Sequence, residues 1–362
     1  MFRQGLRILG ILGLWSSFLT AQNDSRGLKD YFAGYFFVGA SIAPQETEGA
    51  VAQLILKEFN TITAENAMKM GPIHPAEDHY AWEGADQIVD FARKNGLKMR
   101  GHTLCWHNQT PGWLFLDDAG NQVSKAILLD RLKAHITTVM HRYQDAVYAW
   151  DVVNEAISEQ PDEYFRTSPW YTICGEEYIA RAFQYAHEAD PGALLFYNDY
   201  NAWQPQKRAK IIRLIRSLRQ QGVPIHGIGI QGHWSLYGPD EAELEAALDE
   251  YRSLGLIIHI TELDVSVYPP ESGRRDKKPD EDDTFTPEKV KLQEQQYERI
   301  FRVLANHKDD IQSVTFWNVS DQRTWLDRFP VRGRKNYPLL FDTDLQRKTA
   351  YWRVIAGLTG EN

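Results

Sequence analysis

Two glutamates end apolar stretches of the chain in a way that suggests chemistry by paired carboxyl groups. Glu155 closes the stretch 150–156, which reads WDVVNEA, and Glu262 lies in 260–265, which reads ITELDV. A strand that finishes in a polar residue either enters a solvated loop or directs that side chain into a pocket. Two carboxyl groups that face one pocket can hydrolyse a glycoside, because one protonates the leaving oxygen while the other attacks the anomeric carbon or activates water. The sequence does not fix the distance between them, which decides the stereochemical outcome.

Polar or aromatic residues also follow most of the other apolar stretches. They are Glu65, Asn66 and Lys69 after the second stretch, His102 and Trp106 after the third, Asn154 beside Glu155, Gln231 and His233 after the sixth, and Trp317 and Trp325 after the eighth. With Asn66 and Lys69 beside it, Glu65 is more typical of a clamp on sugar hydroxyl groups than of a catalyst. Polar C-terminal ends on so many stretches indicate that Glu155 points into one shared pocket.

Short strands and amphipathic helices alternate along the chain and would position these residues. Strand-like stretches cover residues 36–40, 61–64, 98–102, 147–152, 193–197, 227–231, 257–261 and 313–317. Apolar residues at helical spacing cover 128–142, 206–221 and 242–254. Eight such alternations predict a single (β/α)₈ TIM barrel with its active site at the C-terminal ends of the strands. The alternative is a doubly wound open sheet, but the glycine-rich turn that usually follows its first strand is missing from the sequence.

Composition and charge narrow the class of partner. The 362 residues are 43% hydrophobic and carry a formal net charge of −9, which argues against a nucleic-acid partner. The eleven tryptophans supply either a large core or flat apolar surfaces of the kind that sugars contact. Two cysteines are too few for a disulfide scaffold. We expect Cys105 and Cys174 to be buried free thiols, with a disulfide between them as the alternative.

The first 21 residues predict a secretory signal peptide. Arg3 and Arg7 precede an apolar stretch at 8–19, and residues 19–21 offer a cleavage site. The stretch is short for a membrane anchor, which needs about 20 apolar residues. No other segment is apolar enough to span a bilayer. We therefore predict a secreted or periplasmic monomer whose residues 22–362 form one catalytic barrel domain.

The most charged stretch of the chain is 274–283, where only Pro279 is uncharged. With prolines and a glycine around it, this stretch is predicted to be a long, mobile, solvated loop after the seventh strand. Such a loop can border the pocket.

Two other classes of function compete with glycoside hydrolysis. His102, His107 and His233 together with Glu262 could form a zinc or iron site, but the sequence has no His-Glu-x-x-His motif and no facial-triad spacing. A lectin-like barrel without catalysis would keep the tryptophans and the hydroxyl clamps but would not need both glutamates.

The motifs together resemble those of the family-10 glycoside hydrolases, the (β/α)₈ endo-β-1,4-xylanases. The likeness runs from about Phe37 to Trp352 and includes TAENAMK, GHTLCWHNQTPGWL, WDVVNEA, YNDYN, GIGIQGHW, ITELDV and TFWNVSD followed by TWL. The resemblance implies a retaining enzyme that hydrolyses internal β-1,4-xylosidic bonds of xylan by double displacement, with no cofactor and no metal.

The resemblance also implies a role for each residue of the pocket. Glu155 matches the general acid/base and Glu262 the nucleophile. Asn154 would bond the 2-hydroxyl of the sugar at the cleavage point, and the next sugar on the glycone side would be held by Glu65, Asn66 and Lys69. The cleavage subsite would be lined by His102, Trp106 and Gln231. His233 would orient the nucleophile with Asp264 behind it, and the walls of the glycone subsites would be Trp317 and Trp325.

Two residues depart from the family pattern. Met70 stands where many relatives carry an aromatic residue or proline, and Asn318 stands where glycine is usual. We expect the Asn318 side chain to narrow or rewire a glycone subsite without touching the catalytic pair. Exo action, or mixed specificity toward other β-1,4-glycosides, is the alternative on the same scaffold, and the loop after the seventh strand is a candidate for closing one end of the cleft.

Overall fold

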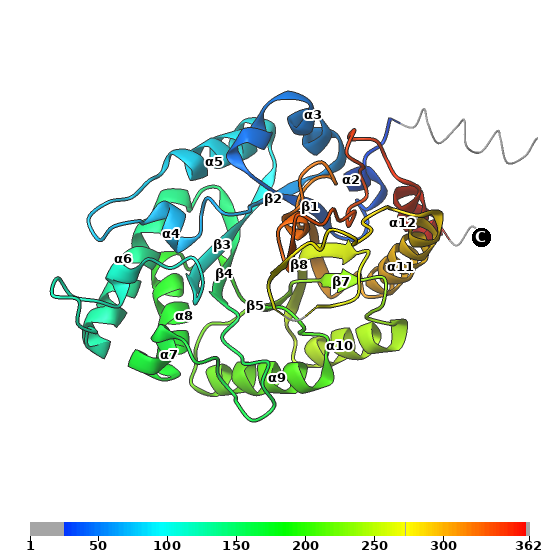
Figure 1. Cartoon of the computed structure of the whole chain (residues 1–362). Coiled ribbons are helices and arrows are strands. Elements are labelled where there is room, and N and C mark those ends of the chain that lie inside the picture. The colour runs from blue at the N-terminus through cyan, green and yellow to red at the C-terminus, as the bar shows by residue number, and fades with distance from the viewer. Residues whose placement is uncertain (1–24, 272, 360–362) are drawn as a thin grey trace, which may run out of the picture.

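The computed structural model describes residues 25–271 and 273–359, and in this part of the chain eight parallel strands close into a barrel (Figure 1). Their order is β10-β1-β2-β3-β4-β5-β6-β8, and pairing of β10 with β8 completes the ring. The strands are β1 (Phe37–Ile42), β2 (Thr61–Ala64), β3 (Lys98–Trp106), β4 (Val147–Asn154), β5 (Leu194–Asp199), β6 (Gly227–Ile230), β8 (Ile257–Ser266) and β10 (Ile311–Phe316). The predicted TIM barrel is confirmed, and closure of the ring excludes the open sheet.

Helices form an outer ring around the strands (Figure 1). They are α2 (Leu28–Tyr31), α3 (Gly49–Glu58), α4 (Met70–Ile73), α5 (Glu83–Asn95), α6 (Lys125–Tyr143), α7 (Pro169–Cys174), α8 (Glu177–Ala189), α9 (Pro205–Gln220), α10 (Glu241–Ser253), α11 (Pro287–Asn306) and α12 (Thr349–Thr359), with short 3₁₀ turns at η1 (Pro44–Thr47), η2 (Gly112–Leu114) and η3 (Trp325–Asp327). The three stretches predicted to be helical correspond to α6, α9 and α10, each within a few residues.

Local sequence explains where these helices lie and begin. Along α6, Leu128, Leu132 and Ile136 are fully buried at three-to-four spacing, so this stripe packs against the barrel. At the start of α10, the Asp240 carboxylate accepts from the Glu243 backbone N–H at 2.9 Å, while the Glu243 carboxylate accepts from the Asp240 N–H at 3.0 Å. This capping box satisfies two amides that the first turn leaves without a partner.

Several strands continue beyond the apolar stretches that predict them. β3 runs on to Trp106, β4 to Asn154 and β8 to Ser266, so the polar residues that follow the apolar stretches are themselves in strand conformation. A short strand, β7 (His233–Ser235), adds to β8 in parallel, with His233 opposite Asp264. Strands therefore carry His102, Trp106, Asn154, His233 and Glu262, and the other site residues lie in the segments that directly follow strands.

The charged stretch 274–283 is a loop without a buried residue, as predicted, and it contains one short strand. Its β9 (Arg275–Asp276) pairs in parallel with β11 (Val331–Arg332), in the segment that follows Trp325. The Arg275 guanidinium contacts the Glu281 carboxylate at 2.7 Å, and Arg334 pairs with the same carboxylate at 2.8 Å. These contacts, which the sequence did not predict, tie the loop to the segment after Trp325.

The predicted signal peptide at 1–21 lies outside the described residues and stays a prediction. Among residues 25–271 and 273–359, no helix has the length and apolar character needed to cross a membrane. Cys105 and Cys174 are buried free thiols, as expected from the sequence. Burial raises the pKa of the Cys174 thiol to about 11, so this thiol stays protonated at neutral pH.

Candidate active site

Glu262 lies on the C-terminal half of β8 and is only 5% exposed. Its Oε1 accepts a hydrogen bond from the Asn198 side-chain amide at 2.7 Å, and its Oε2 lies 3.2 Å from Nε2 of His233. Burial alone would raise the pKa of this carboxyl group, but nearby His102, His233 and Lys69 outweigh burial and lower it. Glu262 is therefore held as a carboxylate, the form that a nucleophile requires.

His233 supplies much of the positive charge beside Glu262. Its Nδ1 lies 2.9 Å from Oδ2 of Asp264, which also accepts from the indole N–H of Trp325 at 2.7 Å. Burial opposes the imidazolium charge, but the carboxylates of Asp264 and Glu262 outweigh it and raise the pKa of His233 to about 10. Both ring nitrogens then carry hydrogens, so His233 donates to both carboxylates.

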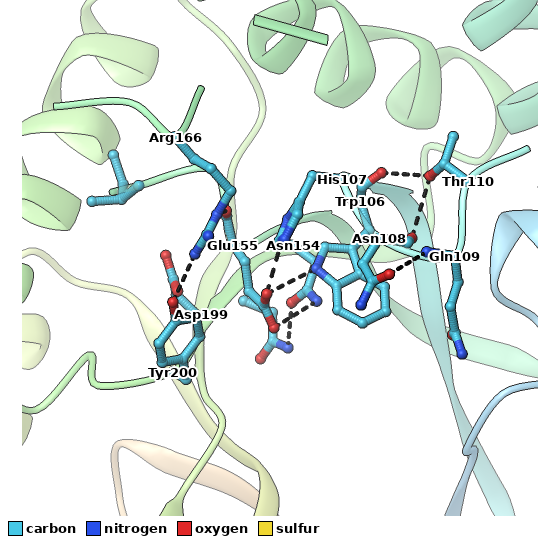
Figure 2. A network of polar contacts seen from close by, with 12 residues as sticks. Trp106, His107, Asn108, Gln109, Thr110, Asn154, Glu155, Arg166, Asp199 and Tyr200 are labelled. Carbon is cyan, nitrogen blue, oxygen red and sulfur yellow. Dashed lines mark hydrogen bonds and ion pairs between the residues drawn. The ribbon is translucent and has the colours of Figure 1, made fainter. Parts of the chain in front are cut away.

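Glu155 directly follows β4 and reaches the site from a different wall of the barrel (Figure 2). Its Oε2 accepts from the indole N–H of Trp106 at 2.9 Å, and its Oε1 accepts from the Gln231 amide at 2.9 Å. The His107 ring lies 4.0 Å from the same carboxyl group. Burial lowers the pKa of His107 to about 4, although Glu155 opposes this shift, so His107 is neutral near pH 7.

An amide network joins the two glutamates. The Thr261 hydroxyl donates to Oδ1 of Asn198 at 2.6 Å, which leaves the Asn198 amide nitrogen to donate to Glu262 and, at 2.9 Å, to Oδ1 of Asn154. In the flipped orientation the Asn154 amide oxygen would instead accept from the Trp106 indole N–H at 3.2 Å, and its nitrogen would donate to the Asn198 backbone carbonyl at 3.1 Å. Either orientation keeps Asn154 bound to Asn198. Gln231 contacts both Asn154, at 3.3 Å, and Glu155. The two carboxyl groups thus share one preorganised set of donors.

Lys69 and Asn66 lie together on the side of the site formed after β2. The Lys69 ammonium group donates to the Asn66 amide oxygen at 3.0 Å and lies 4.9 Å from the Trp106 ring and 5.6 Å from the Trp317 ring. Burial lowers the pKa of Lys69, while Glu262, Glu65 and Glu155 act in the opposite direction. Hydroxyl donors and acceptors of a sugar would meet this group between two aromatic walls.

Glu65 has an ionic partner that was not predicted from the sequence. Arg323, in the segment after β10, contacts Glu65 at 2.6 Å and Glu46 at 2.7 Å. Burial opposes the charge on Arg323, but these two carboxylates raise its pKa well above the usual range. The pairing holds Glu65 on the rim and supports its assignment to binding rather than to proton transfer.

His102, Trp317 and Trp325 form the remaining wall of the site. Nδ1 of His102 lies 2.9 Å from Oδ2 of Asp151, and because a carboxylate only accepts, the hydrogen is on Nδ1. The Trp317 ring packs edge-on against His102 with centroids 5.2 Å apart, and the Trp325 ring lies 4.7 Å from His233. Aromatic faces therefore border both the Glu155 side and the Glu262 side of the site.

Asn318 does not act as we expected from the sequence. Its side chain is fully buried, and its Oδ1 accepts from the Trp325 backbone N–H at 3.0 Å instead of entering a subsite. Its backbone has φ of 94°, which is unusual for a residue other than glycine. Met70, the other departure, is 2% exposed in the first turn of α4. Asn318 therefore fixes the segment that carries Trp325 and does not narrow the cleft.

The structure brings all the predicted site residues together at one rim of the barrel. A continuous series of contacts joins Asn66, Lys69, His102, Trp106, Asn154, Glu155, Gln231, His233, Glu262, Trp317 and Trp325. Glu65 precedes Asn66 in the chain and is paired with Arg323. Sequence reasoning missed Arg323 and Gln109, whose amide lies 3.4 Å from Asn66. Gln109 follows Trp106 within a polar stretch, and that signal could have identified it.

The histidines of the site have carboxylates as their nearest ionic partners. Within residues 25–271 and 273–359, no three His, Cys, Asp or Glu side chains are grouped in a way that could hold a metal ion. His102 is bound to Asp151, and His233 lies between Asp264 and Glu262. This arrangement favours histidines that orient carboxylates over the zinc or iron site considered above.

Comparison with known proteins gives consistent matches across the chain. The family model described as Glycosyl hydrolase family 10 matches residues 27–357. The chain is 50% identical over 326 residues to endo-1,4-beta-xylanase B of Paenibacillus barcinonensis, covering 90% of this chain and 96% of that protein. It is 47% identical over 330 residues to an endo-1,4-beta-xylanase of Geobacillus stearothermophilus, covering 91% and 97%.

Comparison with solved structures agrees with these sequence matches. The crystal structure of xylanase XynB from Paenibacillus barcinonensis, complexed with a conduramine derivative, superposes with a TM-score of 0.88 at 49% identity, covering 92% of this chain and 99% of that one. A family-10 xylanase of Thermobacillus composti superposes with a TM-score of 0.80 at 46% identity, covering 91% and 99%.

Proposed function

Because the chain belongs to glycosyl hydrolase family 10, we propose that it is a retaining endo-1,4-β-xylanase that cleaves internal β-1,4-xylosidic bonds of xylan. The observation that carries the proposal is the pair Glu155 and Glu262, which reach one site from β4 and β8 and share the donors of Gln231, Asn154 and Asn198. Relatives of 50% and 47% identity are themselves endo-1,4-beta-xylanases.

In the first step Glu155 donates its proton to the glycosidic oxygen while the Glu262 carboxylate attacks the anomeric carbon. The bond to the leaving sugar breaks, and a covalent ester forms between the sugar and Glu262. His233 and Lys69 keep Glu262 ionised, and the Asn198 N–H directs its Oε1. The leaving chain departs with the proton that Glu155 has supplied.

In the second step water replaces the leaving chain. Esterification has removed the negative charge of Glu262, so Glu155 is now free of that repulsion and accepts a proton from the water that attacks the anomeric carbon. The ester bond to Glu262 breaks, Glu155 regains its proton, and the sugar is released with its original anomeric configuration. Each glutamate thereby returns to its starting state.

Sugar binding is proposed for the other residues of the rim. Asn154 is placed to bond the 2-hydroxyl at the cleavage point, because it lies between both glutamates. The group of Glu65, Asn66 and Lys69 would hold the next sugar on the glycone side. His102, Trp106 and Gln231 would line the cleavage subsite, with His233 behind the nucleophile and Trp317 and Trp325 as its aromatic walls.

The test is product analysis after brief incubation with unbranched β-1,4-xylan, run beside Glu262→Ala. A ladder of short xylo-oligosaccharides from the wild type alone supports endo action that depends on Glu262. Xylose as the sole product would replace the proposal with an exo-acting enzyme. A wild type that binds xylan but releases no product would refute hydrolysis and support the lectin-like alternative.

A further inference from the structure

The backbone that carries Glu155 adopts an unusual conformation and is held by a buried cluster of polar side chains. Glu155 has φ of 57°, in the left-handed region that residues other than glycine rarely occupy. Such a conformation persists only where the surroundings enforce it. The residues that contact the backbone of 155–157 therefore decide where the Glu155 carboxyl group lies.

Two of these contacts come from Tyr197, on β5, and Lys207, on α9. The Tyr197 hydroxyl accepts from the Ile157 backbone N–H at 3.0 Å, and the Lys207 ammonium group donates to the Ile157 carbonyl at 2.9 Å. Ile157 is fully buried, so neither backbone group has water as a substitute partner. Both polar groups of the residue two positions after Glu155 are thus bound by side chains.

Asp199 contacts both of these side chains, Tyr197 and Lys207. Its Oδ2 accepts from the Tyr197 hydroxyl at 2.5 Å, and its Oδ1 lies 3.1 Å from the Lys207 ammonium group. A hydroxyl has one hydrogen, so once Tyr197 donates to Asp199 its lone pairs are directed to the Ile157 N–H. Asp199 thereby fixes the direction of both contacts, and it is fully buried at the end of β5.

Arg166 also binds the backbone of Glu155 and lies beside Tyr200 (Figure 2). Its Nε donates to the Glu155 carbonyl at 2.9 Å, and its guanidinium group donates to the Tyr200 hydroxyl at 2.7 Å. Lys207 lies 4.5 Å from the ring of the same tyrosine and also pairs with Glu159 at 2.6 Å. The backbone from Glu155 to Glu159 is therefore tied to one connected cluster.

We propose that Asp199 is the positioning residue of the acid/base Glu155, acting through Tyr197 and Lys207 on the backbone of Ile157. The inference rests on the acid/base role proposed above. Asp199 does not contact Glu155 by hydrogen bond or ion pair, and its effect is to place the carboxyl group within reach of the glycosidic oxygen. Proton donation should then depend on Asp199, whereas attack by Glu262 should not.

Leaving-group dependence separates positioning from a general structural role. We would measure kcat/KM for two aryl xylobiosides, one with a dinitrophenyl leaving group that departs without protonation and one with a phenyl group that needs it. For Tyr197→Phe and Asp199→Asn we expect the ratio of the two constants, dinitrophenyl over phenyl, to rise by about tenfold or more. Tyr197→Phe removes a neutral hydroxyl and keeps the Asp199 carboxyl group, so it tests the contact to Ile157 more directly than Asp199→Asn does.

The matched control is Asp321→Asn. Asp321 is also buried and also paired with a lysine, Lys348, at 2.8 Å, but it lies after β10 and contacts neither Glu155 nor Ile157. This variant should lose a similar amount of stability and keep the wild-type ratio. Tyr197→Phe removes a single oxygen and keeps the ring, so it provides a folded variant even if Asp199→Asn does not fold.

Glu155→Ala calibrates the assay and separates two kinds of failure. If Glu155→Ala raises the ratio strongly while Tyr197→Phe and Asp199→Asn leave it within twofold of wild type, the positioning inference is overturned and the acid role stands. If Asp321→Asn raises the ratio as much as they do, the effect is general destabilisation and the inference is again overturned. If Glu155→Ala itself leaves the ratio unchanged, the acid role proposed above is refuted, and the inference with it.

Discussion

Replacing His233 with asparagine should move the acid limb of the kcat/KM profile to higher pH, and replacing Asp264 as well should move part of it back. The limb reports ionisation of the nucleophile in the free enzyme. His233 is protonated over the whole working range because its pKa is raised to about 10. Its charge lowers the pKa of Glu262, so losing the charge leaves Glu262 protonated up to a higher pH.

The geometry predicts which of the two variants shifts the acid limb farther. At the 3.2 Å between Nε2 and Glu262, and an effective dielectric constant of about 20, the attraction is on the order of 5 kcal/mol. Asp264 binds the other ring nitrogen, Nδ1, at 2.9 Å, so its charge lies farther from Glu262 than that of His233 and repels Glu262 less strongly. His233→Asn removes the attraction and keeps the repulsion, which corresponds to an upper value of about 3 to 4 pH units. The double variant loses both, so its limb should shift by less than that of the single variant.

The assay uses an aryl xylobioside with a dinitrophenyl leaving group, so that proton donation by Glu155 does not limit the rate. The profile is recorded between about pH 4 and 8 for the wild type, His233→Asn and the double variant. His141→Asn, at an exposed position of α6, is the control and should leave the limb in place. A limb that moves by less than half a unit in His233→Asn, or farther in the double than in the single variant, would refute the electrostatic reasoning.

Four further predictions concern individual side chains. Glu155→Ala should spare kcat/KM on activated aryl xylosides more than on xylan, whereas Glu262→Ala should abolish activity on both substrates. Azide should restore turnover by Glu262→Ala and yield a glycosyl azide of inverted configuration, identifiable by NMR. Arg323→Gln should raise KM for xylo-oligosaccharides by about tenfold with a smaller change in kcat, because Glu65 and Glu46 lose their partner, while Arg332→Gln, whose side chain is 75% exposed, should not. Asn318→Gly should raise KM by freeing the segment of Trp325, yet change the unfolding free energy little, because relief of φ at 94° offsets a lost hydrogen bond of about 1 kcal/mol. Burial lowers the pKa of His135 to about 3 and His74 adds to this, so the His135 contribution to stability is complete above the unfolded value of 6.5 and is lost as pH falls toward 3. Between pH 7 and pH 4 this contribution falls by about 3 kcal/mol, so the drop in the urea unfolding free energy should be smaller by that amount in His135→Gln and unchanged in His141→Gln.

The alternation of apolar stretches was sufficient to predict the barrel, but it underestimated the strands. β3 and β8 continue through His102–Trp106 and Thr261–Asp264, where polar residues break the apolar pattern although most of them are buried. Strand pairing, which the sequence does not display, keeps these residues extended. The end of an apolar stretch therefore marked where the site begins rather than where the strand stops.

Glu155, Glu262 and most of their neighbours could be predicted because each lies where an apolar stretch of the sequence ends. The contacts that could not be predicted are those between residues that are far apart in the sequence. Arg323 meets Glu65 from a segment far along the chain, and Asn198 on β5 meets Glu262 on β8 across the intervening strand β6. Asn318 is a residue for which the sequence suggested the wrong location. Its position next to Trp317 suggested a side chain in the cleft, but in the structure that side chain bonds to the backbone of Trp325.

The barrel interior beneath the site contains charge, and this explains how the rim is kept rigid. Arg100 is fully buried and contacts Asp151 at 2.6 Å and Nδ1 of His259 at 2.9 Å. A buried ion pair of this kind contributes little net stability, because desolvation offsets most of the attraction. Asp151, however, also accepts from Nδ1 of His102, which leaves Nε2 of that ring for the cleft. The interior charges therefore set the tautomer and direction of a side chain in the site, and they do so before substrate arrives, which is when orientation lowers the barrier most.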